Sequence, residues 1–317
     1  TVAMIRIGSF AAQNLTLSQN METQARMQEH RIQISTGKKA QAYDGISADT
    51  RRLEGLETKH QQISSFTKSI KRTDQRMAEM ENVVSQLQDI ASDFRSKLLQ
   101  AGSGENLAAT NIQGEAETLL QEAASLLNSE FEGRFLFGGS RTDQAPVVLQ
   151  DNAGNDLQFD DGTPDDIESG AYYRGNDQVL SARVDTDLSV DYGVTADSAN
   201  ESGFHDLISA LARVARPNVA LEQEVENATD NLSDPNNGAI KRLADTRADI
   251  GSTRDVVERT KQRLEDTRLN VEEGITDIEN VDVARAMTEL SGHQTTLQAS
   301  YAVTARVSNL SLLNFLR

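Results

Sequence analysis

Residues 56–101, LETKHQQISSFTKSIKRTDQRMAEMENVVSQLQDIASDFRSKLLQA, contain neither glycine nor proline. Apolar residues recur along this stretch at alternating steps of three and four, with Thr73 as the one polar lapse. This spacing gathers the apolar residues on one face of a helix, which is typical of a coiled coil. The predicted seam consists of Ile63, Phe66, Ile70, Met77, Met80, Val84, Leu87, Ala91, Phe94 and Leu98.

The C-terminal third of the chain carries a second repeat, in which an apolar residue returns every seven positions. These residues are Leu243, Ile250, Val257, Leu264, Val271 and Ile278. A basic residue recurs on the same repeat at Arg247, Arg254, Lys261 and Arg268. Two interpretations of these cations stay open. Their long stems cover the seam while the charged heads reach water, or they form ion pairs that set the register against a neighbouring helix.

Between the two repeats the pattern changes. The cluster AGSGEN at 101–106 ends the first helix, and a further helix is predicted over roughly 106–130. Residues 134–203 then alternate with period two between glycine, asparagine and aspartate residues. Within this segment we expect strands around Val184, Leu188, Val190 and Tyr192.

The sequence thus predicts a mainly α fold, in which long antiparallel coiled-coil helices from both chain ends carry a small β-rich insertion. We expect three parts along the chain. Residues 1–50 and 276–317 form a terminal-helix layer, residues 51–133 and 204–275 form a coiled-coil layer, and residues 134–203 form the insertion.

Composition limits the function of the chain. Its 317 residues are 37% hydrophobic but only 4% aromatic, which suits paired helices better than a broad globular core. The net charge of −18 argues against a nucleic-acid partner, because such binding depends on basic patches. The acid is concentrated in residues 142–206, where fifteen Asp and Glu residues stand against two Arg residues.

No pattern for chemistry stands out. Without cysteine, the chain has no disulfide, thiolate metal site or cysteine nucleophile. The four histidines lack metal-ligand spacing, and the acids of 160–168 do not fit a calcium-binding loop. We therefore expect no catalytic residue, no cofactor and no metal, and we do not expect an enzyme.

The final segment, SNLSLLNFLR at 308–317, is unusually apolar. It is too short to span a bilayer, and no apolar run approaches eighteen residues, so membrane insertion is not expected. The N-terminal TVAMIRIGSFAAQ does not have the form of a Sec signal. The apolar end either packs on the protein's own core or awaits a partner.

Each chain end carries a recognisable motif. In RIQISTGKKAQAYDGISA (31–48) the motif consists of Ile34, Ser35, Gly37, Ala42, Asp44 and Ala48. In residues 276–317 it consists of Ile278, Asp282, Ala284, Leu290, Leu297, Ala299, Ser300 and the run Leu310–Leu313. With these residues, both ends resemble bacterial flagellin. The middle, LNSEFEGRFLFGGSRTDQAPVV (127–148) followed by YYRGNDQ (172–178), is closer to the family's hook–filament junction proteins.

The resemblance implies a structural subunit that polymerises into the flagellar filament for swimming motility. The alternatives are a hook–filament junction protein or, less well matched, a non-flagellar coiled-coil adaptor. The implied partners are further copies of the chain, flagellar junction and cap proteins, and the flagellar type III export apparatus with a chaperone. The implied location is the extracellular flagellum, reached without a cleaved Sec signal. The chain ends would form the inner tube of the filament, which lines its export channel, and the insertion would face solvent.

A free pair of end helices has too few neighbours to offset its ordering entropy of roughly 1–2 kcal/mol per residue. We therefore expect the ends to form an interface that exists only in the polymer. The expected interface residues are Ile5, Ile7, Phe10, Leu15, Leu297, Leu310, Leu312, Leu313, Phe315 and Leu316.

Overall fold

The computed structural model describes residues 2–40, 49–102, 111–151, 153–159, 166–197, 201–217 and 220–315. For residues 2–13 and 307–315 it describes the helical backbone and not the side chains. Contacts divide the chain into two compact units. We call Thr1–Gln61 with Thr267–Arg317 the terminal unit, and Gln62–Asp266 the central unit.

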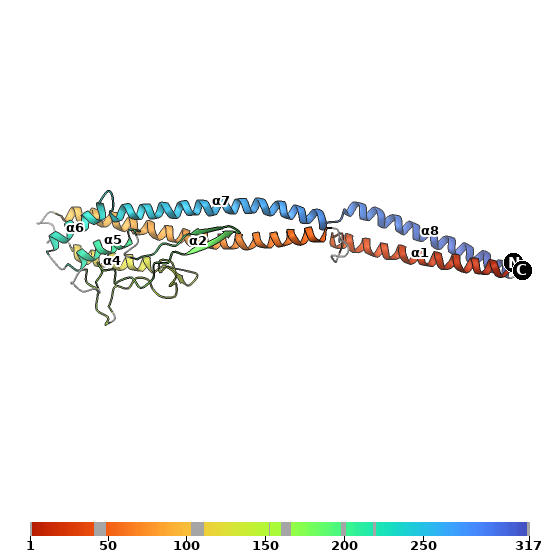
Figure 1. Ribbon diagram of the computed structural model, residues 1–317, viewed down its shortest axis with the longest axis horizontal. Helices are drawn as coiled ribbons and strands as arrows, with labels where there is room; N and C mark the ends of the chain where they lie inside the picture. Colours follow the sequence, from red (N-terminus) through yellow and green to blue (C-terminus); the bar gives the residue numbers. More distant parts are fainter. Residues whose placement is uncertain are drawn as a thin grey trace. The chain divides into compact units, whose positions relative to one another are not determined.

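The described residues are mainly helical, which confirms the predicted fold class (Figure 1). The helices are α1 (Val2–Thr36), α2 (Thr50–Ala101), α4 (Ile112–Leu127), α5 (Phe204–Ala215), α6 (Leu221–Ser233), α7 (Ala239–Glu279) and α8 (Val283–Phe315). The strands are β1 (Glu130–Phe131), β2 (Arg134–Phe135), β3 (Ser181–Asp185) and β4 (Leu188–Asp191). They form two separate antiparallel hairpins, β1–β2 and β3–β4.

In the terminal unit, α1 and α8 lie side by side (Figure 1). Helix α1 ends at Thr36, and the next residue, Gly37, has a φ of +72°, the left-handed conformation that glycine adopts after helix ends. The next residues cross to the break between α7 and α8. There the Lys39 amide donates to the Glu279 carbonyl oxygen at 2.7 Å, and the Val281 amide donates to the Gly37 carbonyl oxygen at 2.9 Å. Both helix breaks are thereby fixed to each other.

The predicted seams lie along α2 and α7, and all their residues except Val271 and Ile278 belong to the central unit. The seam residues of α2 are buried except Phe66, which is half-buried, and those of α7 are buried throughout. Val83 and Ile90 are also buried, and they widen the stripe beyond the predicted seam. A helix with one neighbour does not need this width, so α2 packs against more of the unit than α7 alone.

The middle of the chain is less regular than the alternation predicts. The helix expected over 106–130 is described as α4 only from Ile112 to Leu127, and residues 103–110 lie outside the described part. The first hairpin begins at Glu130, before the predicted start of the insertion, and Tyr192 lies just beyond the end of β4. Helix α5 begins at Phe204, the position at which the coiled-coil layer is expected to resume after the insertion. The insertion is held by packing rather than by an extended sheet: Phe137 meets Phe204 edge to face, with ring centroids 5.3 Å apart.

Candidate interaction surfaces

Few apolar side chains in the described part of the terminal unit are fully buried. Among its described side chains, the buried apolar residues are Leu53, Val271, Ile278 and Ala286. Nine large apolar side chains among the unit's described residues are exposed. They are Leu15, Leu17, Met21, Ile32, Leu269, Val283, Met287, Tyr301 and Val303. An apolar surface on this scale is typical of a binding surface.

Several polar side chains meet across the α1–α8 contact. Gln24 donates to the Tyr301 hydroxyl at 2.7 Å, and the Ser300 hydroxyl donates to Asn20 at 2.6 Å. Further along, His30 stacks on His293 with ring centroids 5.5 Å apart. Polar side chains thus take part in the α1–α8 contact, while Leu17, Met21 and Met287 stay exposed.

The exposed apolar side chains occupy more than one face of each helix. At about 100° per residue, Leu17 and Met21 lie within about 40° of each other, whereas Leu15 lies about 160° from Leu17. On α8, Val283 and Met287 are likewise about 40° apart, whereas Val303 is about 160° from Met287. A single further helix cannot cover both faces, so the terminal unit offers binding surfaces for several neighbours.

Only some of the predicted end-interface residues have side chains that the structure describes. Leu15 is 61% exposed and Leu297 is half-buried. The side chains of Ile5, Ile7, Phe10, Leu310, Leu312, Leu313 and Phe315, and Leu316 as a whole, lie outside the described residues. Sequence reasoning missed Leu17, Met21, Met287 and Val303, because it looked for apolar residues in tight clusters, and these are dispersed along the helices.

The basic repeat of α7 behaves in two ways. Arg254 donates to Asp74 at 2.9 Å and to Glu81 at 2.7 Å, both on α2, and Arg247 lies 3.8 Å from Glu81. Burial disfavours the Arg254 cation, but the hydrogen bonds to both carboxylates outweigh it and raise the pKa of Arg254. Lys261 and Arg268 instead form ion pairs within α7, with Glu258 and Glu272. The register-setting interpretation therefore fits the first two cations only.

The two motifs of the middle region lie against each other. Asn176 accepts from the Ser140 amide at 2.8 Å and donates back to the Ser140 hydroxyl at 2.6 Å. Gly139 has φ of +65°, and a Cβ there would lie 2.4 Å from the Asn176 carbonyl oxygen. The double glycine of FLFGG thus permits the close approach of YYRGN.

Two arginines of the α5 region anchor the insertion to the helices. The Arg213 guanidinium lies 4.0 Å from the centre of the Phe159 ring. Arg216 donates to the Leu157 carbonyl oxygen of the insertion at 2.5 Å and to both carboxylate oxygens of Glu117 on α4, at 2.7 and 3.0 Å. These hydrogen bonds lower the pKa of Glu117. The insertion and the helices of the central unit therefore form one packed body.

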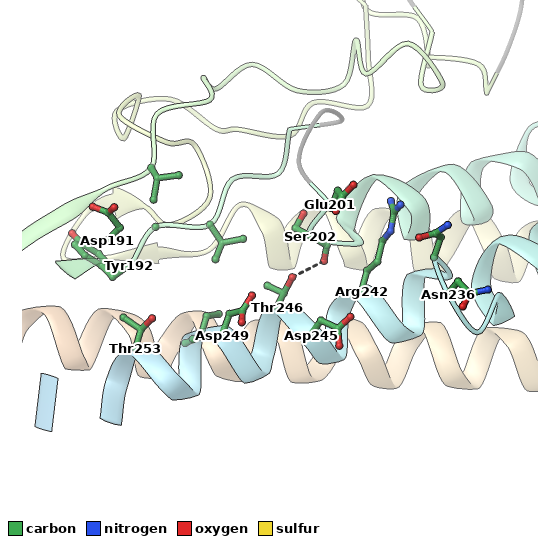
Figure 2. A pocket seen from close by; sticks show the side chains of 15 residues that line it. Asp191, Tyr192, Glu201, Ser202, Asn236, Arg242, Asp245, Thr246, Asp249 and Thr253 are labelled. Atoms are coloured by element: carbon green, nitrogen blue, oxygen red, sulfur yellow. Dashed lines mark hydrogen bonds between the residues drawn. The ribbon is translucent and has the colours of Figure 1, made fainter. Parts of the chain in front are cut away.

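A groove runs between α7 and the segment that follows β4 (Figure 2). Its carboxylates are Asp191, Glu201, Asp245 and Asp249. Within its lining, the Thr246 hydroxyl donates to the Ser202 carbonyl oxygen at 3.0 Å (Figure 2). Within the described ranges, no group of His, Cys, Asp and Glu is arranged to hold a metal. No described helix combines the length and apolar character needed to cross a membrane.

Two family models match the chain, and together they cover more than half of it. The bacterial flagellin N-terminal helical region matches residues 7–142, and the bacterial flagellin C-terminal helical region matches residues 235–316. Flagellar hook-associated protein 3 of Escherichia coli (strain K12) is 26% identical over 318 residues, which cover 92% of this chain and 93% of that protein.

Solved structures with the same fold include two flagellar proteins. A Vibrio parahaemolyticus protein assigned to the flagellar hook-associated proteins has a TM-score of 0.57 at 17% identity, over 74% of this chain and 100% of that chain. FlgL of Bacillus cereus has a TM-score of 0.50 at 14% identity, over 71% of this chain and 99% of that chain.

Proposed function

Because the chain belongs to the bacterial flagellin family and is a structural protein of the flagellum, we propose that it forms the junction between hook and filament. The observation that carries this choice is the end-to-end match to hook-associated protein 3. The match spans the insertion as well as the terminal helices. The second candidate, a filament flagellin, is favoured by the two family models that match the terminal regions.

In this proposal the terminal unit is the assembly element. Full burial of one Leu, Met or Val side chain stabilises by about 1.5–3 kcal/mol, and each exposed residue of the unit retains roughly half of that for a neighbour. Copies that surround α1 and α8 on several sides would bury these residues. Ordering of the terminal helices and assembly would then be one event.

The central unit has its own core and would fold before assembly. We propose that the terminal helices occupy the inner layer of the structure, that α2 and α7 lie outside them, and that the acidic insertion faces solvent, where charge favours solubility. The partners would be further copies of the chain and the adjoining hook, filament and cap proteins. Export would use the flagellar type III apparatus and its chaperone.

Immunogold labelling of flagella on intact cells tests the proposal. An antibody to the insertion is applied to the source bacterium and to a strain that lacks the gene. A junction protein gives label at the boundary between hook and filament, and the deletion strain sheds its filaments. Label along the whole filament would support the flagellin alternative, and label away from flagella would refute both.

A further inference from the structure

A second groove in the central unit is basic, although the whole chain carries a net charge of −18. It has a volume of about 690 Å³ and lies between α2 and the two hairpins. Its cations are Lys68, Arg72, Arg76, Arg134 and Arg183, and its carboxylate is Glu132. Arg72 approaches Glu132 only to 4.0 Å, with both side chains largely exposed, so this ion pair neutralises little of the charge.

Arg76 is the unusual member of the groove. It is only 8% exposed, and its Nη2 donates to the Phe135 carbonyl oxygen at 2.8 Å. Its buried Nε has no hydrogen-bond partner in the described part of the chain. Burial lowers the pKa of Arg76, Tyr192 opposes this effect, and the neighbouring Arg134 adds to it. A buried guanidinium without a carboxylate is costly, so the groove as it stands is electrostatically incomplete.

Carboxylates are the natural complement to this groove, because guanidinium groups bind them through paired N–H donors. The chain carries a dense source of carboxylates in residues 142–206, with fifteen acids against two arginines. Several are already used: Asp185 pairs with Arg263, and Asp206 pairs with Arg242. Others are exposed and, within the described residues, take part in no ion pair. These are Asp177, Asp187, Asp191 and Glu201.

We propose that the basic groove binds carboxylates of the acidic stretch 142–206 from a neighbouring copy of the chain. This inference rests on the proposed function, which places copies side by side. The contact is heterologous, because a basic surface of one copy meets an acidic surface of the next, and such contacts generate rings or helices rather than closed dimers. It also gives chains of high like charge a local attraction that directs their relative position.

Carbodiimide cross-linking on isolated flagella tests the contact, because this reagent joins an amine to a carboxylate only when the two touch. Two copies of the chain, each with a different epitope tag, are expressed together. The expected product is a mixed-tag dimer in which Lys68 is joined to an acid within residues 142–206, as read by mass spectrometry. The Lys68→Arg variant keeps the charge but removes the amine, and it should lose this product.

Charge reversal supplies the second readout. Arg134→Glu, at an exposed site in the groove, should lower the yield of the Lys68 dimer about tenfold. The matched control is Arg259→Glu, at an exposed position of α7 outside the groove. Thermal melts of both variants check that the fold is intact.

Assembled flagella that contain the chain but give no Lys68-dependent dimer, or a dimer to acids elsewhere, would overturn this inference alone. A chain absent from the flagella would overturn the proposed function together with it.

Discussion

Leu17 and Leu87 permit a direct comparison of the two units, because the same substitution can be made on a long helix in each. Leu87 is fully buried in the central unit, whereas Leu17 of the terminal unit is 59% exposed. We consider Leu17→Ala and Leu87→Ala in the free chain and in the assembled flagellum. Both substitutions remove the same side-chain atoms, so any difference in their effects on stability or assembly comes from the surroundings of each residue.

The expected effects on the free chain differ widely. Leu87→Ala loses buried apolar surface and leaves a cavity, at a cost of about 2–5 kcal/mol. For a unit of this size, each kcal/mol shifts the melting temperature by about 2–4 °C, so a fall of roughly 4–20 °C is expected. Leu17→Ala loses only the minor part of a burial worth about 1.5–3 kcal/mol, and it gains slightly in helix propensity. Leu17→Ala should therefore lower the free energy of unfolding of the free chain by less than about 1 kcal/mol.

Assembly should invert this order. The exposed part of Leu17 is buried only against neighbours, so its loss weakens each contact by about 1 kcal/mol, or roughly fivefold in association. Circular dichroism melts measure the first effect. Competition with the tagged parent chain for places in the flagellum measures the second. If Leu17→Ala melts as low as Leu87→Ala, or is incorporated as well as the parent, the assignment of the terminal unit as an assembly surface is wrong.

Four further outcomes are expected. Gly203→Ala should destabilise by about 1–3 kcal/mol in urea unfolding, because φ is +85° and the new Cβ would lie 2.9 Å from the Leu243 amide nitrogen of α7. Arg254→Gln should lower stability by about 1 kcal/mol at low salt, with a smaller difference at high salt. Burial lowers the pKa of His205, so the unfolded chain takes up a proton before the folded chain does as the pH falls below about 6.5. The free energy of unfolding therefore decreases as the pH falls through this range. The His205→Gln variant should show a smaller decrease in urea unfolding measured over the same pH range. A fragment of residues 62–266 should melt cooperatively within about 5 °C of the full chain, and failure to fold would show that the terminal unit is part of one cooperative structure.

The long helices are predictable from the sequence because their signal is local. A heptad repeat specifies which residues share a face whatever the neighbour is, and Ile70, Leu87 and Leu98 are fully buried. Val83 and Ile90 lie outside the alternating three–four spacing of the predicted seam, so the repeat did not predict their burial. Contacts with α4, through Lys97 and Glu115, and with α6, through Arg95 and Ser233, exist only once the chain has folded back on itself.

The middle region was less predictable for a related reason. Its alternation produces only short hairpins, and the rest depends on contacts between distant residues. Gly139 and Asn176 are far apart in sequence, yet one requires the absence of a side chain where the other approaches. The sequence gives no reason to expect that Arg76 is buried, because a single basic residue in a heptad repeat is normally assumed to extend into solvent.

The width of the apolar surface on a helix indicates how many neighbours it needs. Helix α2 carries a broad stripe, and the chain itself supplies the neighbours: α7 through Asp74, α4 through Lys97 and α6 through Arg95. Helix α1 also carries apolar residues on more than one face, at Leu15 and Leu17, but its extended contact within the chain is with α8. A helix with such a surface and one neighbour is unstable in water unless others arrive. The same packing rule that completes α2 within one chain therefore requires further chains for α1.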